Sequence, residues 1–331
     1  MNLMRNTCRL VFLIIGFAIF YFTVVFILSS IQFKGLTLLQ ILTADKIGPG
    51  GWGHSLLRFR ELQNIKNVDI LFVGSSKAYR GYDPRVFQTK NYAAFNMGST
   101  SQTPMNTYFL LKQYLPKIKP KVIVFDLDIT DMAMDGYEGI LDLLANIPIS
   151  WELLEMSVAT GNPHAVTNFL GKLIRDQKWP LASFDQQNMK NDKYISGGYV
   201  ETTIDSEWVA DDNIAKIKIL NNQLDYCSKI LELAKTFNIP IVEVIQPMND
   251  ILLRSIPNYK TIADHLKNSA MKRSVIFIDF NNTMHLDPFV DYMDEFHLNQ
   301  KGVLKYNTVL LDRLMANKVL LPRAVGPIGT H

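Results

Sequence analysis

The chain has 331 residues, of which 48% are hydrophobic and 20% are charged, and its formal net charge is +3 at pH 7. This hydrophobic share allows a sizeable core and excludes wholesale disorder. The small net charge, without a basic stripe that carries interleaved aromatic residues, argues against a nucleic-acid-binding protein. The two cysteines, Cys8 and Cys227, predict neither a disulfide framework nor a cysteine-type metal site.

An uncharged apolar run from Val11 to Leu28 is the first predicted element. As a helix it spans about 27 Å, close to the hydrocarbon thickness of a bilayer. Arg5 and Arg9 precede it, which predicts a cytoplasmic N-terminus and an extracytoplasmic main domain. A cleaved signal peptide, cut near Ser29 and Ser30, is the alternative. The length of the run and the lack of a small-x-small site favour a signal anchor.

From Val68 onward, short apolar runs alternate with amphipathic stretches. Such runs, ending in Gly or following Pro, are typical of buried parallel strands. The predicted strands are Val68–Val73, Tyr92–Met97, Val122–Leu127, Pro240–Gln246 and Ser274–Phe280. The predicted helices are Thr103–Leu115, ended by Pro116 and Pro120, then Asn213–Asn238, Tyr259–Ala270 and Gln300–Ala316. This alternation predicts an α/β fold, a flavodoxin-like three-layer sandwich with a parallel sheet of about five strands.

The predicted organisation is a signal anchor over residues 1–33, a linker over 34–66 and one α/β domain over 67–320. A stretch at about 146–212 breaks the alternation. It offers helix-like pieces only at Trp151–Ser157 and Ala165–Arg175. Loops of this length in compact domains are usually functional or disordered. We therefore predict an insertion, either a lid over the strand ends or a peripheral decoration without ligand contact.

Two short motifs at opposite ends of this domain carry the candidate chemistry. Gly74-Ser75-Ser76 follows the first strand, and Asp294-Glu295-Phe296-His297 precedes the last helix. A serine hydroxyl needs a base, and a histidine oriented by a carboxylate supplies one. We predict Ser76 as the nucleophile, His297 as the base and Asp294 as its orienting carboxylate. Of the six histidines, His297 alone has a carboxylate three residues before it.

Further polar residues and glycines fall at the carboxyl ends of the predicted strands, where ligands bind in parallel α/β sheets. The backbone amides of Ser76 and Gly98 are predicted to form an oxyanion hole. Arg80, Asp128 and Gln246 are predicted to contact substrate. The alternative is a solvated or packing role for Arg80 and a structural role for Asp128. We predict no metal and no cofactor; a cation bound by the carboxylates that end the third strand is the alternative.

These motifs resemble those of the SGNH (GDSL-like) hydrolases over about residues 68–317. The segment Leu71–Ser76 resembles the first block, with Ser75 at the position of the usual aspartate. Phe95–Ser99 resembles the second block, whose glycine helps to form the oxyanion hole, and Asp294–His297 resembles the fifth. The third block departs from the family, because Phe125–Asp131 has no asparagine that could donate to an oxyanion. Replacement donors considered from the sequence are Gln246, Asn96 and Thr130.

With its predicted anchor, the chain is similar to the branch that includes DltD and the alginate O-acetylation proteins. That resemblance implies a serine esterase or O-acyltransferase acting on acyl esters, commonly acetyl, of cell-envelope glycans. It also implies a membrane-bound O-acyltransferase as a possible partner, and no nucleic acid. A catalytically inactive glycan-binding or assembly scaffold is the alternative, motivated by the missing asparagine. A weaker alternative is that the apolar helix pairs with another membrane protein.

Overall fold

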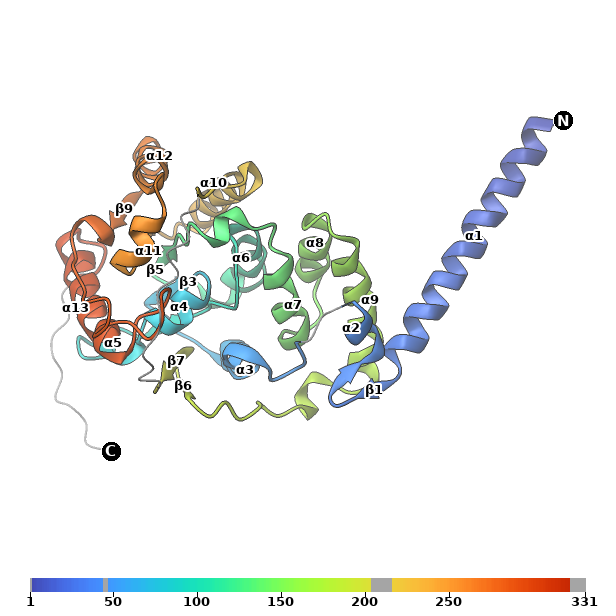
Figure 1. Cartoon of the computed structure of the whole chain (residues 1–331), viewed down its shortest axis with the longest axis horizontal. Helices are drawn as coiled ribbons and strands as arrows, with labels where there is room; N and C mark the ends of the chain where they lie inside the picture. Colours follow the sequence, from blue (N-terminus) through green and yellow to red (C-terminus); the bar gives the residue numbers. More distant parts are fainter. Residues whose placement is uncertain (1, 44–46, 204–215, 322–331) are drawn as a thin grey trace.

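The computed structural model describes residues 2–43, 47–203 and 216–321. One long helix, α1 (Asn2–Ser29), projects from an α/β domain that contains the remaining described residues (Figure 1). Between Met4 and Ser29, α1 is long and apolar enough to cross a membrane, and its most apolar 18-residue stretch has a mean hydropathy of 2.9. This agrees with a membrane anchor by length and composition. The side of the membrane on which the domain lies stays a prediction.

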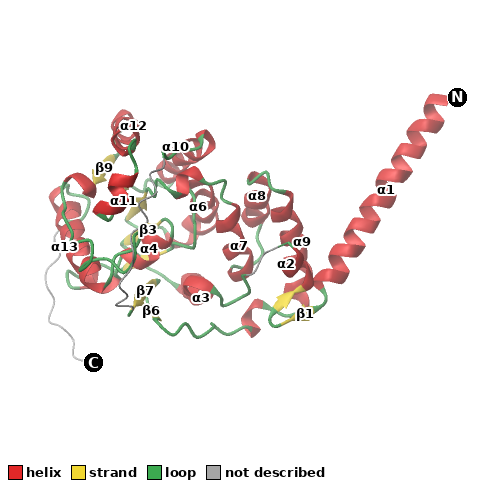
Figure 2. Cartoon of the chain, viewed as in Figure 1, coloured by secondary structure: helices red, strands yellow, loops and turns green. Residues whose placement is uncertain are grey.

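A five-stranded parallel sheet forms the centre of the domain (Figure 2). Its strands are β3 (Ile70–Val73), β4 (Ala94–Asn96), β5 (Val122–Asp126), β8 (Ile241–Ile245) and β9 (Ile276–Asp279). Their spatial order is β4-β3-β5-β8-β9, and each neighbouring pair is parallel. This is the 2-1-3-4-5 order of flavodoxin-like folds. The predicted fold class is confirmed, and every strand lies inside its predicted run.

Helices cover both faces of the sheet. Successive residues of a strand face opposite sides, and the strands carry apolar side chains on both, so each face needs a covering layer. Leu71 and Val73 belong to one core layer, and Ile70 and Phe72 belong to the other. The first layer includes side chains of α3 (Ser55–Asn64), α6 (Pro104–Ile118), α10 (Asn221–Thr236) and α12 (Tyr259–Lys272). The second includes side chains of α4 (Ser76–Gly81), α5 (Pro84–Gln88) and α13 (Gln300–Ala316).

The other described elements lie around this sandwich. The helices are α2 (Leu38–Leu42), α7 (Tyr137–Asn146), α8 (Trp151–Ala159), α9 (Pro163–Lys178) and α11 (Asp250–Ser255). Two small antiparallel pairs are formed by β1 (Gln32–Phe33) with β2 (Leu36–Thr37), and by β6 (Asp192–Ile195) with β7 (Tyr199–Thr202). Short 3₁₀ turns occur at Trp52–His54, Asp131–Ala133, Leu181–Ser183 and Phe280–Asn282.

Some elements differ from the sequence-based predictions. Residues 34–66, predicted as a linker, contain α2 and α3, and Phe59 and Leu62 of α3 are fully buried in the core. Helix α6 continues past Pro116, at the loss of one intrahelical hydrogen bond. Helix α10 begins only at Asn221: residues 213–215 of the predicted helix lie outside the described ranges, but 216–220 are described and are not helical, so the predicted start was too early. The division into anchor, linker and one domain stays a prediction.

Candidate active site

Ser76 is the first residue of α4, directly past the carboxyl end of β3. Gly74 makes the turn between them with a φ of +154°, and a Cβ at this position would lie 2.8 Å from the Cβ of Asp126. Only glycine fits such a turn without strain. Ser75 caps the helix, since its Oγ accepts a hydrogen bond from the amide of Lys77. The local sequence therefore directs Ser76 to the ligand-binding edge of the sheet.

Asp294 and His297 lie in the loop that leads into α13. Asp294 Oδ1 accepts hydrogen bonds from the backbone amides of Phe296 at 2.8 Å and His297 at 2.7 Å. The same carboxylate contacts the imidazole, with Nδ1 of His297 2.9 Å from Oδ2 and 3.0 Å from Oδ1. The Asp-x-x-His spacing thus forms a turn that holds the carboxylate against its own histidine.

The structure brings these two motifs together. The Oγ of Ser76 lies 2.9 Å from Nε2 of His297, although 221 positions separate the two residues. The His297 side chain is 17% exposed and the Asp294 side chain 40%. Ser76, His297 and Asp294 therefore form a continuous hydrogen-bonded relay at the protein surface, where a substrate can approach.

The electrostatics of Asp294 suit a carboxylate that orients a base. Burial raises its pKa, but hydrogen bonds from the imidazole of His297 and from the amides of Phe296 and His297 outweigh burial, so the pKa of Asp294 is lowered. An ionised carboxylate only accepts hydrogen bonds, so Nδ1 of a neutral His297 carries the ring proton. Its Nε2 is then free to accept the proton of Ser76.

The second predicted oxyanion donor is engaged within the protein. The amide of Gly98 donates to Oδ1 of Asn96 at 2.9 Å, and Nδ2 of Asn96 donates to the carbonyl of Ala78. A Cβ at Gly98 would lie 2.9 Å from the carbonyl oxygen of Ser75, so glycine permits this close approach to α4. The amide of Ser76 is at the first position of α4, where a helix offers no intrahelical acceptor. Ser76 therefore has the more available amide of the two.

The predicted substrate-contact residues are also engaged internally. Arg80 forms an ion pair with Asp192 of β6, with 2.8 Å between Nη2 and Oδ2. Gln246 is 5% exposed, and its Nε2 donates to the carbonyl of Lys77 at 3.0 Å and to the carboxylate of Asp126. Asp128 is buried as well. Arg80, Gln246 and Asp128 therefore all have partners within the protein, and their contact with substrate stays a prediction.

Asp128 holds both neighbours of Ser76. Ser75 Oγ donates to Oδ2 of Asp128 at 3.2 Å, and Lys77 Nζ donates to Oδ1 at 3.1 Å. The Lys77 and Asp128 side chains are only 7% and 4% exposed. The amide and hydroxyl of Thr130 complete the contacts of this carboxylate. One side chain from the end of β5 therefore restrains the backbone on both sides of Ser76.

Lys77 was missed in the sequence analysis. Burial lowers its pKa, but the carboxylates of Asp128, Asp131 and Asp126 outweigh burial and raise it. In the same cluster, burial and the charge of Asp128 raise the pKa of Asp126 to about 8. The available signal was a lysine directly after the serine, facing a strand end that carries several aspartates. Among the described residues, no group of His, Cys, Asp and Glu side chains is arranged to hold a metal ion.

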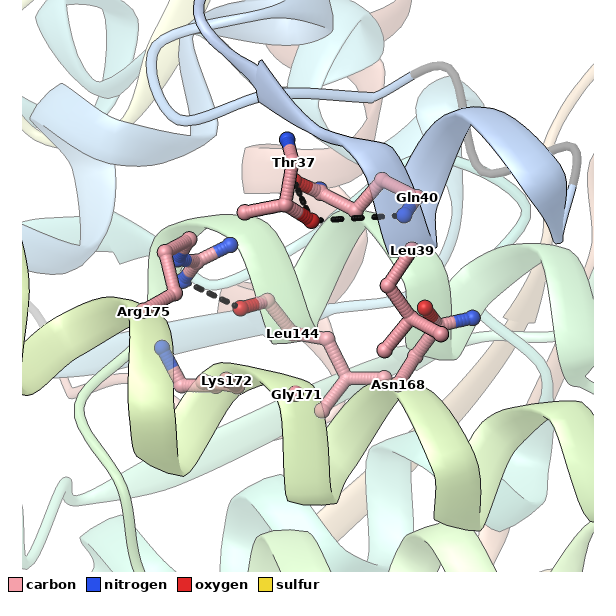
Figure 3. A pocket seen from close by; sticks show the side chains of 8 residues that line it. All are labelled: Thr37, Leu39, Gln40, Leu144, Asn168, Gly171, Lys172 and Arg175. Atoms are coloured by element: carbon pink, nitrogen blue, oxygen red, sulfur yellow. Dashed lines mark hydrogen bonds between the residues drawn. The ribbon is translucent and has the colours of Figure 1, made fainter. Parts of the chain in front are cut away.

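A second buried basic cluster lies at the base of α1, among α2, α7 and α9 (Figure 3). Lys172 Nζ is 2.7 Å from Oδ2 of Asp176, and Nε of Arg175 donates to Oδ1 of the same carboxylate at 2.8 Å. Arg175 also donates to the carbonyl of Leu144. Lys172 and Arg175 line a cavity of about 10 Å³, which has room for about one water molecule. Burial, together with the charge of Arg175, lowers the pKa of Lys172 to about 8.

No protein-family model and no curated protein matches the chain. Several solved structures resemble it, two of them from Bacteroides species. One is a protein of Bacteroides fragilis NCTC 9343 assigned as an acylhydrolase, with a TM-score of 0.44 and 12% identity over 82% of this chain and 99% of that chain. The other is a GDSL-like lipase of Bacteroides thetaiotaomicron VPI-5482, with a TM-score of 0.43 and 11% identity over 82% of this chain and 100% of that chain. Similarity this low identifies neither the family nor the activity.

Proposed function

We propose that this protein is a membrane-anchored, extracytoplasmic serine esterase or O-acyltransferase of the SGNH hydrolase kind. Its substrates are acyl esters, with acetyl esters of cell-envelope glycans as the first candidates. The observation that carries the proposal is the relay in which Ser76 Oγ lies 2.9 Å from Nε2 of His297, whose Nδ1 lies 2.9 Å from Asp294. A nucleophile, a base and an orienting carboxylate within hydrogen-bond reach are what acyl transfer through serine requires.

In the proposed reaction, Ser76 Oγ attacks the ester carbonyl while its proton moves to Nε2 of His297. The C–O bond of the leaving alcohol then breaks, and the proton on Nε2 passes to that alcohol. This leaves the acyl group on Ser76. Water or a glycan hydroxyl next attacks the acyl carbon while its proton moves to Nε2 of His297. The bond between the acyl carbon and Ser76 Oγ then breaks, and Oγ takes the proton back from Nε2. Asp294 stabilises the imidazolium in both halves of the reaction. Hydrolysis and transfer differ only in the acceptor.

The oxyanion would be stabilised by the amide of Ser76 and by a second donor. Gly98 can provide that donor only if Asn96 releases its amide, since the two are joined by a 2.9 Å hydrogen bond. This bond favours one second candidate, a catalytically inactive SGNH-like scaffold that binds envelope glycans or assembles a complex. The two candidates differ in whether Ser76 is chemically activated.

Labelling of the full chain with a fluorophosphonate, followed by peptide mass spectrometry, tests the proposal. The expected result is a phosphonyl adduct on Ser76 that is absent in Ser76→Ala and formed at least about 100-fold more slowly in His297→Ala. His285→Ala is the matched control, because His285 is exposed and lies in the same loop region; it should label at the normal rate. A folded protein without an adduct would contradict the esterase proposal and favour the scaffold.

A further inference from the structure

The C-terminal third of α1 packs along α9 rather than projecting freely. The hydroxyls of Tyr21 and Thr167 are 2.7 Å apart. Further along both helices, a Cβ at Gly171 would lie 2.9 Å from Oγ of Ser29, so the two helices are in close contact there. These contacts advance in the same direction along both helices. The N-terminus of α9 therefore points toward the N-terminal part of α1 (Figure 1).

The undocked part of α1 is too short to cross a bilayer by itself. From Leu10 to Phe20 a helix rises about 16 Å, whereas the hydrocarbon core of a bilayer is about 30 Å thick. Arg5 and Arg9 limit the apolar stretch at its other end. If α1 crosses a membrane, part of its docked length has to lie in the bilayer. The beginning of α9 and its connection to α8 then lie at the membrane too.

The composition of this connection fits such a position. Between Met156 and Gly171 there is no Asp, Glu, Lys or Arg, in a chain of which 20% is charged. We call residues 158–164 the α8–α9 tip. Val158 in the tip is 59% exposed, and Pro163 and His164 are exposed as well. Because charged side chains are costly in lipid, an exposed segment without them suits the membrane interface better than its charged surroundings do.

We infer that the α8–α9 tip is in contact with the lipid of the bilayer beside α1 and holds the α/β domain against the membrane. The inference rests on the proposed membrane anchor and is independent of the proposed catalysis. The competing arrangement is that α1 separates from α9 when it inserts. That would uncover Val25 and Ser29, which are 2% and 0% exposed, and would break the contact between Tyr21 and Thr167.

Depth-dependent fluorescence quenching in the full chain tests the inference. Single cysteines at Val158, Leu304 and Ile14, each in a Cys8→Ser background, carry an environment-sensitive dye in vesicles of phosphatidylcholine and phosphatidylglycerol that contain nitroxide-labelled lipids. Val158 and Leu304 are 59% and 57% exposed, so they are matched in solvent access. Leu304 lies on α13, at the opposite end of the domain from α1 (Figure 1). Ile14 reports on insertion of α1 itself.

The inference predicts that nitroxide-labelled lipid, with either a shallow or a deep label, quenches the dye at position 158 at least about twofold more than the dye at 304, since only position 158 would be in contact with lipid. A deep nitroxide should quench the dye at position 14. Quenching at position 14 with equal signals at 158 and 304 would overturn the inference and leave the anchor intact. No quenching at position 14 would overturn the anchor, and the inference with it.

Discussion

Lys77 and Lys172 are both buried lysines paired with an aspartate, yet their surroundings differ. Lys77 pairs with Asp128 beside the candidate nucleophile, and the additional carboxylates of Asp131 and Asp126 raise its pKa. Lys172 shares the single carboxylate of Asp176 with Arg175, and its pKa is lowered to about 8. One cluster has an excess of carboxylates, and the other has an excess of cations.

This difference in charge balance indicates how much each lysine contributes to the free energy of unfolding. Removing the cation near Ser76 would leave the buried carboxylate of Asp128 without a counter-charge, next to the further acidic groups Asp126 and Asp131, which is strongly unfavourable. Removing Lys172 would leave Asp176 paired with Arg175. Burial alone therefore does not distinguish an indispensable lysine from a dispensable one, whereas the balance of charges around it does. Only the cluster at Ser76 also holds the backbone of a candidate catalytic residue.

The largest expected effect is that of Asp128→Asn. The change leaves the ammonium of Lys77 without its carboxylate partner and weakens the hold on both neighbours of Ser76. We expect a loss of about 3–5 kcal/mol in the free energy of unfolding, as for broken buried ion pairs. We also expect fluorophosphonate labelling of Ser76 to slow by about tenfold or more, because small displacements of reacting groups are costly.

Asp176→Asn is the matched control for this variant. It removes the carboxylate of the other buried cluster and should lower stability while leaving the labelling rate of Ser76 unchanged. Stability is measured by urea unfolding. Labelling is measured without urea, at a temperature at which both variants are folded. Equal slowing of labelling in the two variants would mean that the contacts of Asp128 do not position Ser76.

A smaller effect is expected from replacing each lysine by methionine. Lys77→Met should destabilise the protein by about 2–3 kcal/mol, since Asp128 loses its cation. Lys172→Met should change the free energy of unfolding by less than about 1 kcal/mol, since Arg175 still pairs with Asp176. A larger loss in Lys172→Met than in Lys77→Met would reverse the ranking that we draw from the charge balance.

The smallest expected effect is on the pH dependence of stability. The folded pKa of Lys172 is about 8, below its ordinary value of 10.5, so between these values the unfolded chain binds a proton that the folded protein does not. The free energy of unfolding should therefore rise with pH in this window, by about 1–2 kcal/mol from pH 8 to 9.5. Lys77, whose pKa is raised, contributes no such rise.

Denaturant titrations of the wild type and of Lys172→Met, at several pH values up to 9.5, measure this contribution. Burial raises the pKa of several tyrosines in the folded protein, Tyr114 and Tyr194 among them. Ionisation of these tyrosines in the unfolded chain would therefore lower stability at high pH, and the upper limit of 9.5 keeps this opposing effect small. The rise should be smaller in the variant. An identical pH dependence in both proteins would show that Lys172 keeps an ordinary pKa.

Much of the fold follows from local patterns in the sequence. Apolar runs, four of them bounded by glycine or proline, predict all five strands. The capping residue Asn299 helps to explain why α13 spans Gln300–Ala316 as predicted. The Asp-x-x-His motif likewise encodes its own turn, since Asp294 binds the amides that follow it. Such features depend on residues close together in the chain.

What the sequence did not reveal depends on long-range contacts. The clamp of Asp128 on Ser75 and Lys77 joins residues more than 50 positions apart. The hydrogen bond that occupies the amide of Gly98 comes from a side chain whose direction no pattern specifies. Residues 34–66 lack a regular pattern, yet Phe59 completes the core against distant helices. Partners of this kind are visible only once the chain is folded.

The contact between α1 and α9 has a consequence for the stability of the domain if α1 is removed. Val25 and Ser29 of α1 are almost completely covered, and Ser29 lies against α9 at Gly171. A protease that cut the chain near residue 30 would therefore remove the part of α1 that packs on α9 together with the proposed membrane anchor. The released form would carry a fresh apolar surface on α9, and self-association or rapid degradation would follow. Under the proposed function, proteolytic release from the membrane would therefore inactivate the protein.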